Sequence, residues 1–139
     1  MLIGKKYTIK TKIMKTSYIN LILKIVVAVI LLQTLLFKFS GSDESVYIFT
    51  KLGAEPYGRI GSGIIELIIS ILLFVNKTKL YAAIMAFGTM LVAAISHLTI
   101  LGIEVMNDGG TLFMLSLIVL FCSSILVFQY KNDFKLKLI

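Results

Sequence analysis

Four long apolar segments constrain this chain of 139 residues more than any other feature, because their length suits a bilayer better than an aqueous core. They cover Ile19–Phe39, Tyr57–Val75, Leu80–Leu101 and Thr111–Tyr130. A helix needs roughly 20 mainly apolar residues to cross a hydrocarbon core of about 30 Å, and short connections make successive helices antiparallel. The sequence therefore predicts an all-α polytopic membrane protein whose residues 19–130 form a four-transmembrane-helix antiparallel bundle.

The composition agrees with a membrane protein and excludes several kinds of site. Hydrophobic residues make up 58% of the chain and charged residues 15%, with a mean hydropathy of +0.98, whereas soluble domains are about 45–50% apolar and about 25% charged. The single cysteine excludes an intramolecular disulfide and a Cys-x-x-Cys redox pair. With one histidine as well, the chain cannot build a bis-histidine haem site or a Cys- or His-rich metal site, and we expect no metal.

The basic residues predict the orientation of the bundle. Ten of the fourteen lysines and arginines lie in residues 1–18, in residues 131–139, or at Lys77 and Lys79. With four spans these regions share one side of the membrane, which the positive-inside rule identifies as the cytoplasm. We therefore expect a multi-pass protein of a bacterial cytoplasmic membrane, with two basic cytoplasmic tails flanking the transmembrane domain. The lysines suit contact with anionic lipid, and no aromatic-interleaved basic face indicates nucleic-acid binding.

The first outer connection is predicted to contain a short amphipathic helix. Ser42 can cap a helix whose first turn holds Asp43 and Glu44, where acidic groups favour the positive end of the helix. Apolar residues give the segment up to Leu52 one apolar face, and Gly53 is placed to end it. We expect this helix to lie at the outer interface over the mouth of the bundle; an ordinary ordered loop is the alternative.

Polar residues at membrane depth are the candidate functional residues, because burying them is costly. Gln33, Lys38, Glu66 and His97 all fall in the outer half of the bundle when span directions alternate, which predicts one polar cluster open to the outside. Ser62 shares a helical face with Glu66. Glu66 and His97 are the candidates for proton exchange, and Lys38, Gln33 and Ser62 for binding a polar ligand. Glu66 can be neutralised by Lys38 or by taking up a proton.

Each of these residues also has a structural interpretation. Interhelical hydrogen bonds hold membrane helices together at about 0.6 kcal/mol each, which would account for Glu66, His97 and Gln33. Lys38 and Arg59 can extend to the outer interface, with their charge in water and their stems in lipid. Asp108, followed by two glycines, predicts a tight outer turn before the last span.

The order of these motifs resembles the DoxX family of small four-span bacterial membrane proteins. The resemblance covers about 23–127 and is carried, in chain order, by Leu36-Phe37-Lys38-Phe39-Ser40-Gly41, Val46–Leu52 closed by Gly53, Gly61-Ser62-Gly63-Ile64-Ile65-Glu66-Leu67, Ala82-Ala83 and Ala93-Ala94-Ile95-Ser96-His97. It implies a role beside redox enzymes, because some relatives resemble quinone-linked subunits of sulfur-compound oxidoreductases and others resemble membrane anchors for oxidative-stress enzymes. Relatives that handle disulfides carry cysteine pairs, which this chain lacks.

The leading hypothesis is a membrane subunit of a quinone-linked redox system. Glu66 and His97 would exchange protons with a quinone, while Lys38 and Gln33 stabilise negative charge. The chain has no recognisable flavin, haem or iron–sulfur site, so electrons would come from a redox enzyme partner and the chain would be at most an oxidoreductase subunit. A non-catalytic scaffold and a proton-coupled small-molecule carrier are the alternatives, and a homo-oligomer is a further possible partner arrangement.

Overall fold

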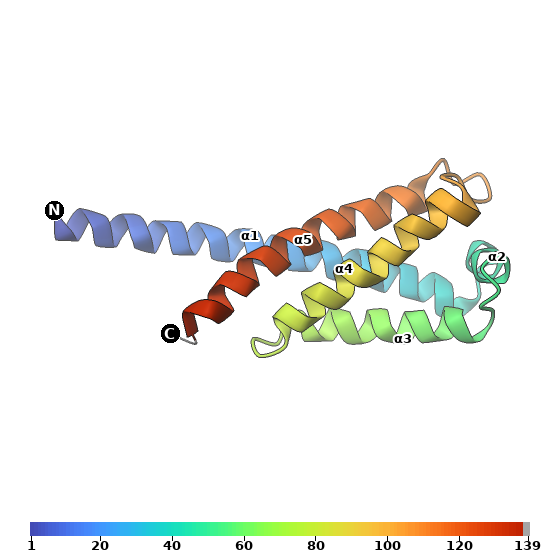
Figure 1. Cartoon of the computed structure of the whole chain (residues 1–139), viewed down its shortest axis with the longest axis horizontal. Helices are drawn as coiled ribbons and strands as arrows, with labels where there is room; N and C mark the ends of the chain where they lie inside the picture. The colour runs from blue at the N-terminus through green and yellow to red at the C-terminus, as the bar shows by residue number, and fades with distance from the viewer. Residues whose placement is uncertain (138–139) are drawn as a thin grey trace.

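The protein is all-helical over the part of the chain that the computed structural model describes, residues 1–137. Its elements are α1 (Leu2–Ser40), α2 (Asp43–Lys51), α3 (Tyr57–Leu72), α4 (Lys79–Ser96), the π-helical turn η1 (His97–Leu101) and α5 (Thr111–Lys137). Figure 1 shows α1, α3, α4 and α5 running alternately in opposite directions. Both termini and the connection 73–78 lie toward one end, and α2 and the connection 102–110 lie at the other.

Among the described residues, three helical segments are long and apolar enough to cross a membrane: Leu2–Ser40, Lys79–Leu101 and Thr111–Phe134. This confirms a membrane protein with several apolar helices. α3 is shorter than predicted, because it ends at Leu72 after 16 residues rather than at Val75. The chain turns there, and the Thr78 hydroxyl donates to the carbonyl oxygen of Leu72 (3.1 Å).

Helix α1 is longer than its predicted span. It has 39 residues and includes the basic N-terminal segment, which is exposed and extends away from the bundle (Figure 1). That segment contains no proline, so nothing in its backbone interrupts the helix. α5 likewise continues beyond Tyr130 to Lys137; residues 138 and 139 of the predicted C-terminal tail lie outside the described residues.

The core lies where α1, α3, α4 and α5 pack together. α4 contributes a face of small residues, Ala82, Ala83 and Ala86, all fully buried. Small side chains let membrane helices approach closely and gain packing contacts. The larger side chains around them are Val27, Leu31, Ile69, Leu73, Val119 and Leu126.

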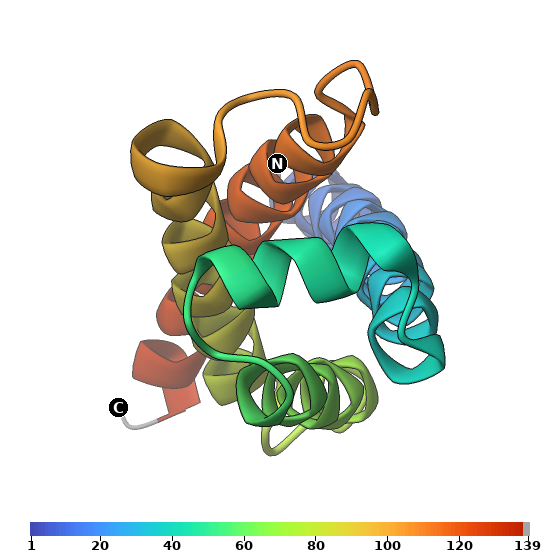
Figure 2. The ribbon, with the colours of Figure 1, turned by 90° about the vertical axis from the view of Figure 1, so that its right-hand side faces the viewer.

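The short helix predicted in the first outer connection is confirmed as α2. The Ser42 hydroxyl accepts a hydrogen bond from the backbone N–H of Ser45 (3.3 Å), which caps the helix start. Gly53, with φ of +68°, stands just after its end, where a side chain would strain the left-handed backbone. Figure 2 shows α2 lying across one end of the bundle. The residues at its two ends thus account for where α2 begins and ends, and its position closes off one end of the bundle.

Candidate functional site

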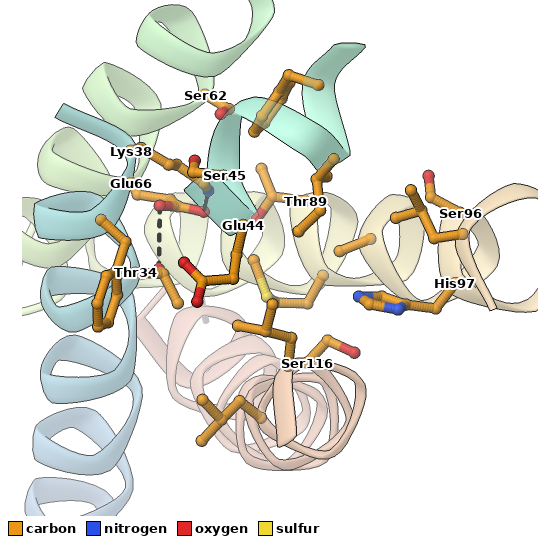
Figure 3. A pocket seen from close by; sticks show the side chains of 18 of the residues that line it. Thr34, Lys38, Glu44, Ser45, Ser62, Glu66, Thr89, Ser96, His97 and Ser116 are labelled. Atoms are coloured by element: carbon orange, nitrogen blue, oxygen red, sulfur yellow. Dashed lines mark hydrogen bonds and ion pairs between the residues drawn. The ribbon is translucent and has the colours of Figure 1, made fainter. Parts of the chain in front are cut away.

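A half-open cavity of about 690 Å³ lies beneath α2. α1, α3, α4 and α5 supply its walls, and Figure 3 shows its labelled polar side chains coming from several helices. Most of the wall is apolar, from residues such as Ile30, Ile65 and Leu115. The structure brings all five sequence-predicted site residues to this one cavity: Gln33, Lys38, Ser62, Glu66 and His97.

An ion pair between Lys38 and Glu66 forms one side of the cavity. The Lys38 ammonium contacts Glu66 Oε1, and the Thr34 hydroxyl lies 3.2 Å from Glu66 Oε2. The Glu66 side chain is only 3% exposed and that of Lys38 16%. Of the two ways to neutralise Glu66 that the sequence left open, the structure has the ion pair. The pair joins α1 to α3.

Arg59 positions Lys38 rather than extending to the membrane interface. Its guanidinium contacts the Glu55 carboxylate, with Nε 2.8 Å from Oε1, and it also donates from Nη1 to the carbonyl oxygen of Lys38. Lys38 lies in the last turn of α1, where its carbonyl oxygen also accepts from the backbone N–H of Gly41 (3.4 Å). Arg59 therefore closes the end of α1 at the residue that holds Glu66.

His97 lies on the opposite side of the cavity from Glu66 (Figure 3). It is 5% exposed, begins the turn η1, and packs its ring against Phe113 with 5.7 Å between centroids. Its Nδ1 lies 2.9 Å from the carbonyl oxygen of Gly102. A carbonyl oxygen only accepts hydrogen bonds, so Nδ1 carries the proton. In the neutral ring Nε2 is then an acceptor.

The connection 102–110 is organised by Asp108, which confirms the predicted turn. Its carboxylate accepts hydrogen bonds from the backbone N–H groups of Val105 (2.9 Å), Gly110 (2.8 Å) and Leu112 (3.0 Å). Burial raises the pKa of the Asp108 carboxyl, but these three donors outweigh it and hold the pKa below its ordinary value of 3.8. Asp108 thus fixes the loop that carries the carbonyl partner of His97.

Sequence reasoning missed several polar residues of the cavity. Glu44, treated there as a helix-end charge, points into the cavity from α2 near Thr34 (Figure 3). Ser45, Thr89 and Ser116 also line it. A signal for Glu44 was present, because it stands four residues before Ile48 and so shares the helical face that covers the bundle.

A comparison with family models matches residues 19–99 to the model described as DoxX. The chain belongs to the DoxX family. The match covers all five predicted site residues, together with α2, α3 and α4, and confirms the resemblance in that region. It ends before α5, so it is shorter than the 23–127 region of the sequence resemblance. No curated protein and no solved structure matches the chain.

Proposed function

We propose that this DoxX-family protein is a membrane subunit of a quinone-linked redox system and binds the quinone head group in the cavity beneath α2. The observation that carries the proposal is the layout of the cavity. Its wall is mainly apolar, and its ionisable groups stand on opposite sides, the Lys38–Glu66 pair on one and His97 on the other. A quinone head group has the same layout, an apolar ring with oxygen atoms at opposite positions.

Two roles are assigned to the cavity residues, proton exchange and the stabilisation of negative charge. Reducing a quinone to a quinol takes two electrons and two protons. His97 Nε2 and the Glu66 carboxylate are the groups that exchange the protons, and Lys38 stabilises negative charge on a ligand oxygen. Gln33 and Ser62 line the same cavity as further hydrogen-bonding groups. The electrons come from, or pass to, a redox enzyme partner.

The proposed setting is a bacterial cytoplasmic membrane crossed four times, with both termini in the cytoplasm. The basic termini and the connection 73–78 lie toward one end of the bundle (Figure 1), and the positive-inside rule makes that end cytoplasmic. α3 would span about 24 Å at about 1.5 Å per residue, and a bilayer accommodates such a short span by thinning. In this orientation the cavity opens in the outer half of the membrane.

Single cysteines test this topology in vesicles, with Cys122 replaced by alanine. A membrane-impermeant maleimide added outside right-side-out vesicles is expected to label a cysteine in place of the exposed Glu104 and to leave one in place of the exposed Lys77 unlabelled until the membrane is permeabilised. Labelling of both positions from outside would contradict four spans.

A non-catalytic scaffold is the second candidate, and one observation favours it. Glu66 is satisfied within the chain by Lys38 and Thr34, so these polar groups can act solely to join α1 to α3. On that alternative, Glu66→Gln lowers stability, the bundle stays folded, and the cavity binds no quinone.

The deciding experiment measures binding of a short-chain naphthoquinone to the full-length protein in lipid nanodiscs by isothermal titration calorimetry. Ala93 lines the cavity, so Ala93→Phe is expected to abolish binding by filling it. Ile95→Phe is the matched control, because that side chain is half-exposed and lies outside the cavity lining. Absence of binding to the folded wild type, or binding that survives Ala93→Phe, would refute the proposal and leave the scaffold.

A further inference from the structure

Most hydroxyl groups that line the cavity donate their proton within the chain. Five of them donate to backbone carbonyl oxygens within their own helix or loop, at distances of 2.6–3.1 Å: Ser62, Thr89, Ser96, Thr111 and Ser116. A hydroxyl has one proton and two acceptor lone pairs. Toward a ligand, these five groups therefore offer acceptors.

His97 and Glu44 add the strongest acceptors. The hydrogen bond from His97 Nδ1 to Gly102 leaves Nε2 as an acceptor at the cavity. The Glu44 carboxylate accepts only, and within residues 1–137 it forms no ion pair. Figure 3 shows Glu44 reaching into the cavity from α2. The other two acidic side chains that line the cavity already have partners: Lys38 pairs with Glu66, and three backbone N–H groups donate to Asp108.

Donors are fewer. The Lys38 ammonium keeps N–H groups beyond the one directed at Glu66, Gln33 supplies an amide, and Ser42 and Ser45 supply hydroxyls. The side of the cavity that holds His97 offers acceptors from Ser96, His97 and Ser116. A ligand oxygen on this side of the cavity must donate a hydrogen bond to one of these acceptors. A ligand oxygen that cannot donate leaves the acceptor without a partner.

We infer that the cavity binds the reduced, hydroxyl-bearing quinol more tightly than the oxidised quinone. This inference rests on the proposed function and adds the redox form that the site selects. His97 Nε2 accepts from one quinol hydroxyl and the Glu44 carboxylate from the other. A quinone carbonyl only accepts, so it cannot pair with either group, whereas the Lys38 ammonium can donate to the oxygen of either redox form. Losing a hydrogen bond to a charged group corresponds to roughly a 10- to 100-fold weaker Kd.

The experiment compares three ligands that share one ring system, using full-length protein in nanodiscs under anaerobic conditions. The probes are 1,4-naphthoquinone, its quinol 1,4-dihydroxynaphthalene, and 1,4-dimethoxynaphthalene, which carries two oxygen atoms but no hydroxyl proton. The quinol is expected to bind roughly 10- to 100-fold more tightly than the other two. A dimethoxy compound that binds as tightly as the quinol would overturn the inference, because hydrogen-bond donation would then play no part.

Glu44→Gln tests the residue that the inference depends on. Glu44 is exposed on α2, so the variant is expected to fold, and its amide offers a donor beside an acceptor. The preference for quinol is expected to fall several-fold, from weaker quinol binding and stronger quinone binding. Asp43→Asn is the matched control, because Asp43 stands in the same first turn and does not line the cavity.

The outcomes distinguish a failure of the quinol preference from a failure of the proposed quinone site. Equal binding of quinol and quinone, or tighter binding of quinone, overturns the preference and leaves the quinone site standing. A preference that is unchanged in Glu44→Gln overturns the role of Glu44. Binding of neither form refutes the proposed function, and the preference with it.

Discussion

Replacing Lys38 with methionine is expected to destabilise the protein more than replacing Glu66 with glutamine, although each removes one partner of the same ion pair. The Glu66 side chain is 3% exposed, whereas that of Lys38 is 16% exposed. Lys38→Met leaves a buried carboxylate whose remaining partner is the Thr34 hydroxyl at 3.2 Å. Glu66→Gln leaves an ammonium that reaches water and lies 5.9 Å from the centroid of the Phe49 ring.

The magnitudes follow from the cost of a buried unpaired charge. Removing one partner of a buried pair typically costs about 3–5 kcal/mol. Lys38→Met, which leaves the buried Glu66 carboxylate without its cation, is therefore expected to cost about 3–5 kcal/mol. Glu66→Gln is expected to cost about 1–2 kcal/mol, because the ammonium that remains reaches water.

The assay is reversible unfolding in mixed micelles by a denaturing detergent, followed by circular dichroism at pH 7. Lys51→Met serves as the control, because Lys51 is exposed on α2 and forms no ion pair within the described residues. Equal losses of stability from Lys38→Met and Glu66→Gln would refute the reasoning, since Glu66 would then behave as a solvated group.

Three further predictions concern packing and capping. Gly58→Ala is expected to cost about 1–3 kcal/mol from overpacking, because the added Cβ would lie 2.6 Å from the Ala54 Cβ. Gly61→Ala, with nothing within 4 Å, is expected to stabilise α3 by up to about 1 kcal/mol through helix propensity; thermal unfolding in detergent compares the two, and the reverse order would contradict the packing. Ser42→Ala is expected to destabilise α2 by about 1 kcal/mol. Hydrogen exchange measures this as a rise in the amide exchange rates of α2, relative to wild type, that exceeds any rise in α4. Asp108→Ala is expected to cost about 0.5–2 kcal/mol at pH 7; since the folded pKa lies below 3.8, this stabilisation is complete above about pH 4 and is lost as the pH falls through the folded pKa, so wild type and variant should converge in acid.

The features that the sequence predicted well depend on neighbouring residues. The cap at Ser42, the end of α2 before Gly53 and the turn at Asp108 each arise within a few residues, and all three are confirmed. The Lys38–Glu66 pair was one of two predicted options, because helix spacing placed both groups at the same depth.

Other features depend on how the connections are routed. α3 ends at Leu72, where the chain turns and Thr78 donates to the Leu72 carbonyl oxygen, whereas the apolar segment in the sequence extended the predicted span to Val75. Arg59 contacts the end of α1, which hydropathy cannot reveal. Glu44 enters the cavity because α2 folds back over the bundle, so its role depends on a tertiary arrangement.

The sequence by itself determined that this chain forms apolar helices for a membrane, because a bilayer requires long apolar segments whose backbone groups are satisfied within each helix. It also determined which few residues are polar at depth. The tertiary structure alone decided which partners those residues have. Lys38 pairs with Glu66, the Gly102 carbonyl oxygen accepts a hydrogen bond from His97 Nδ1, and backbone carbonyl oxygens accept hydrogen bonds from hydroxyl groups such as that of Ser62. The physical reason is that hydrogen-bond capacity is a property of neighbours in space, so what a cavity offers to a ligand is known only when its internal partners are known.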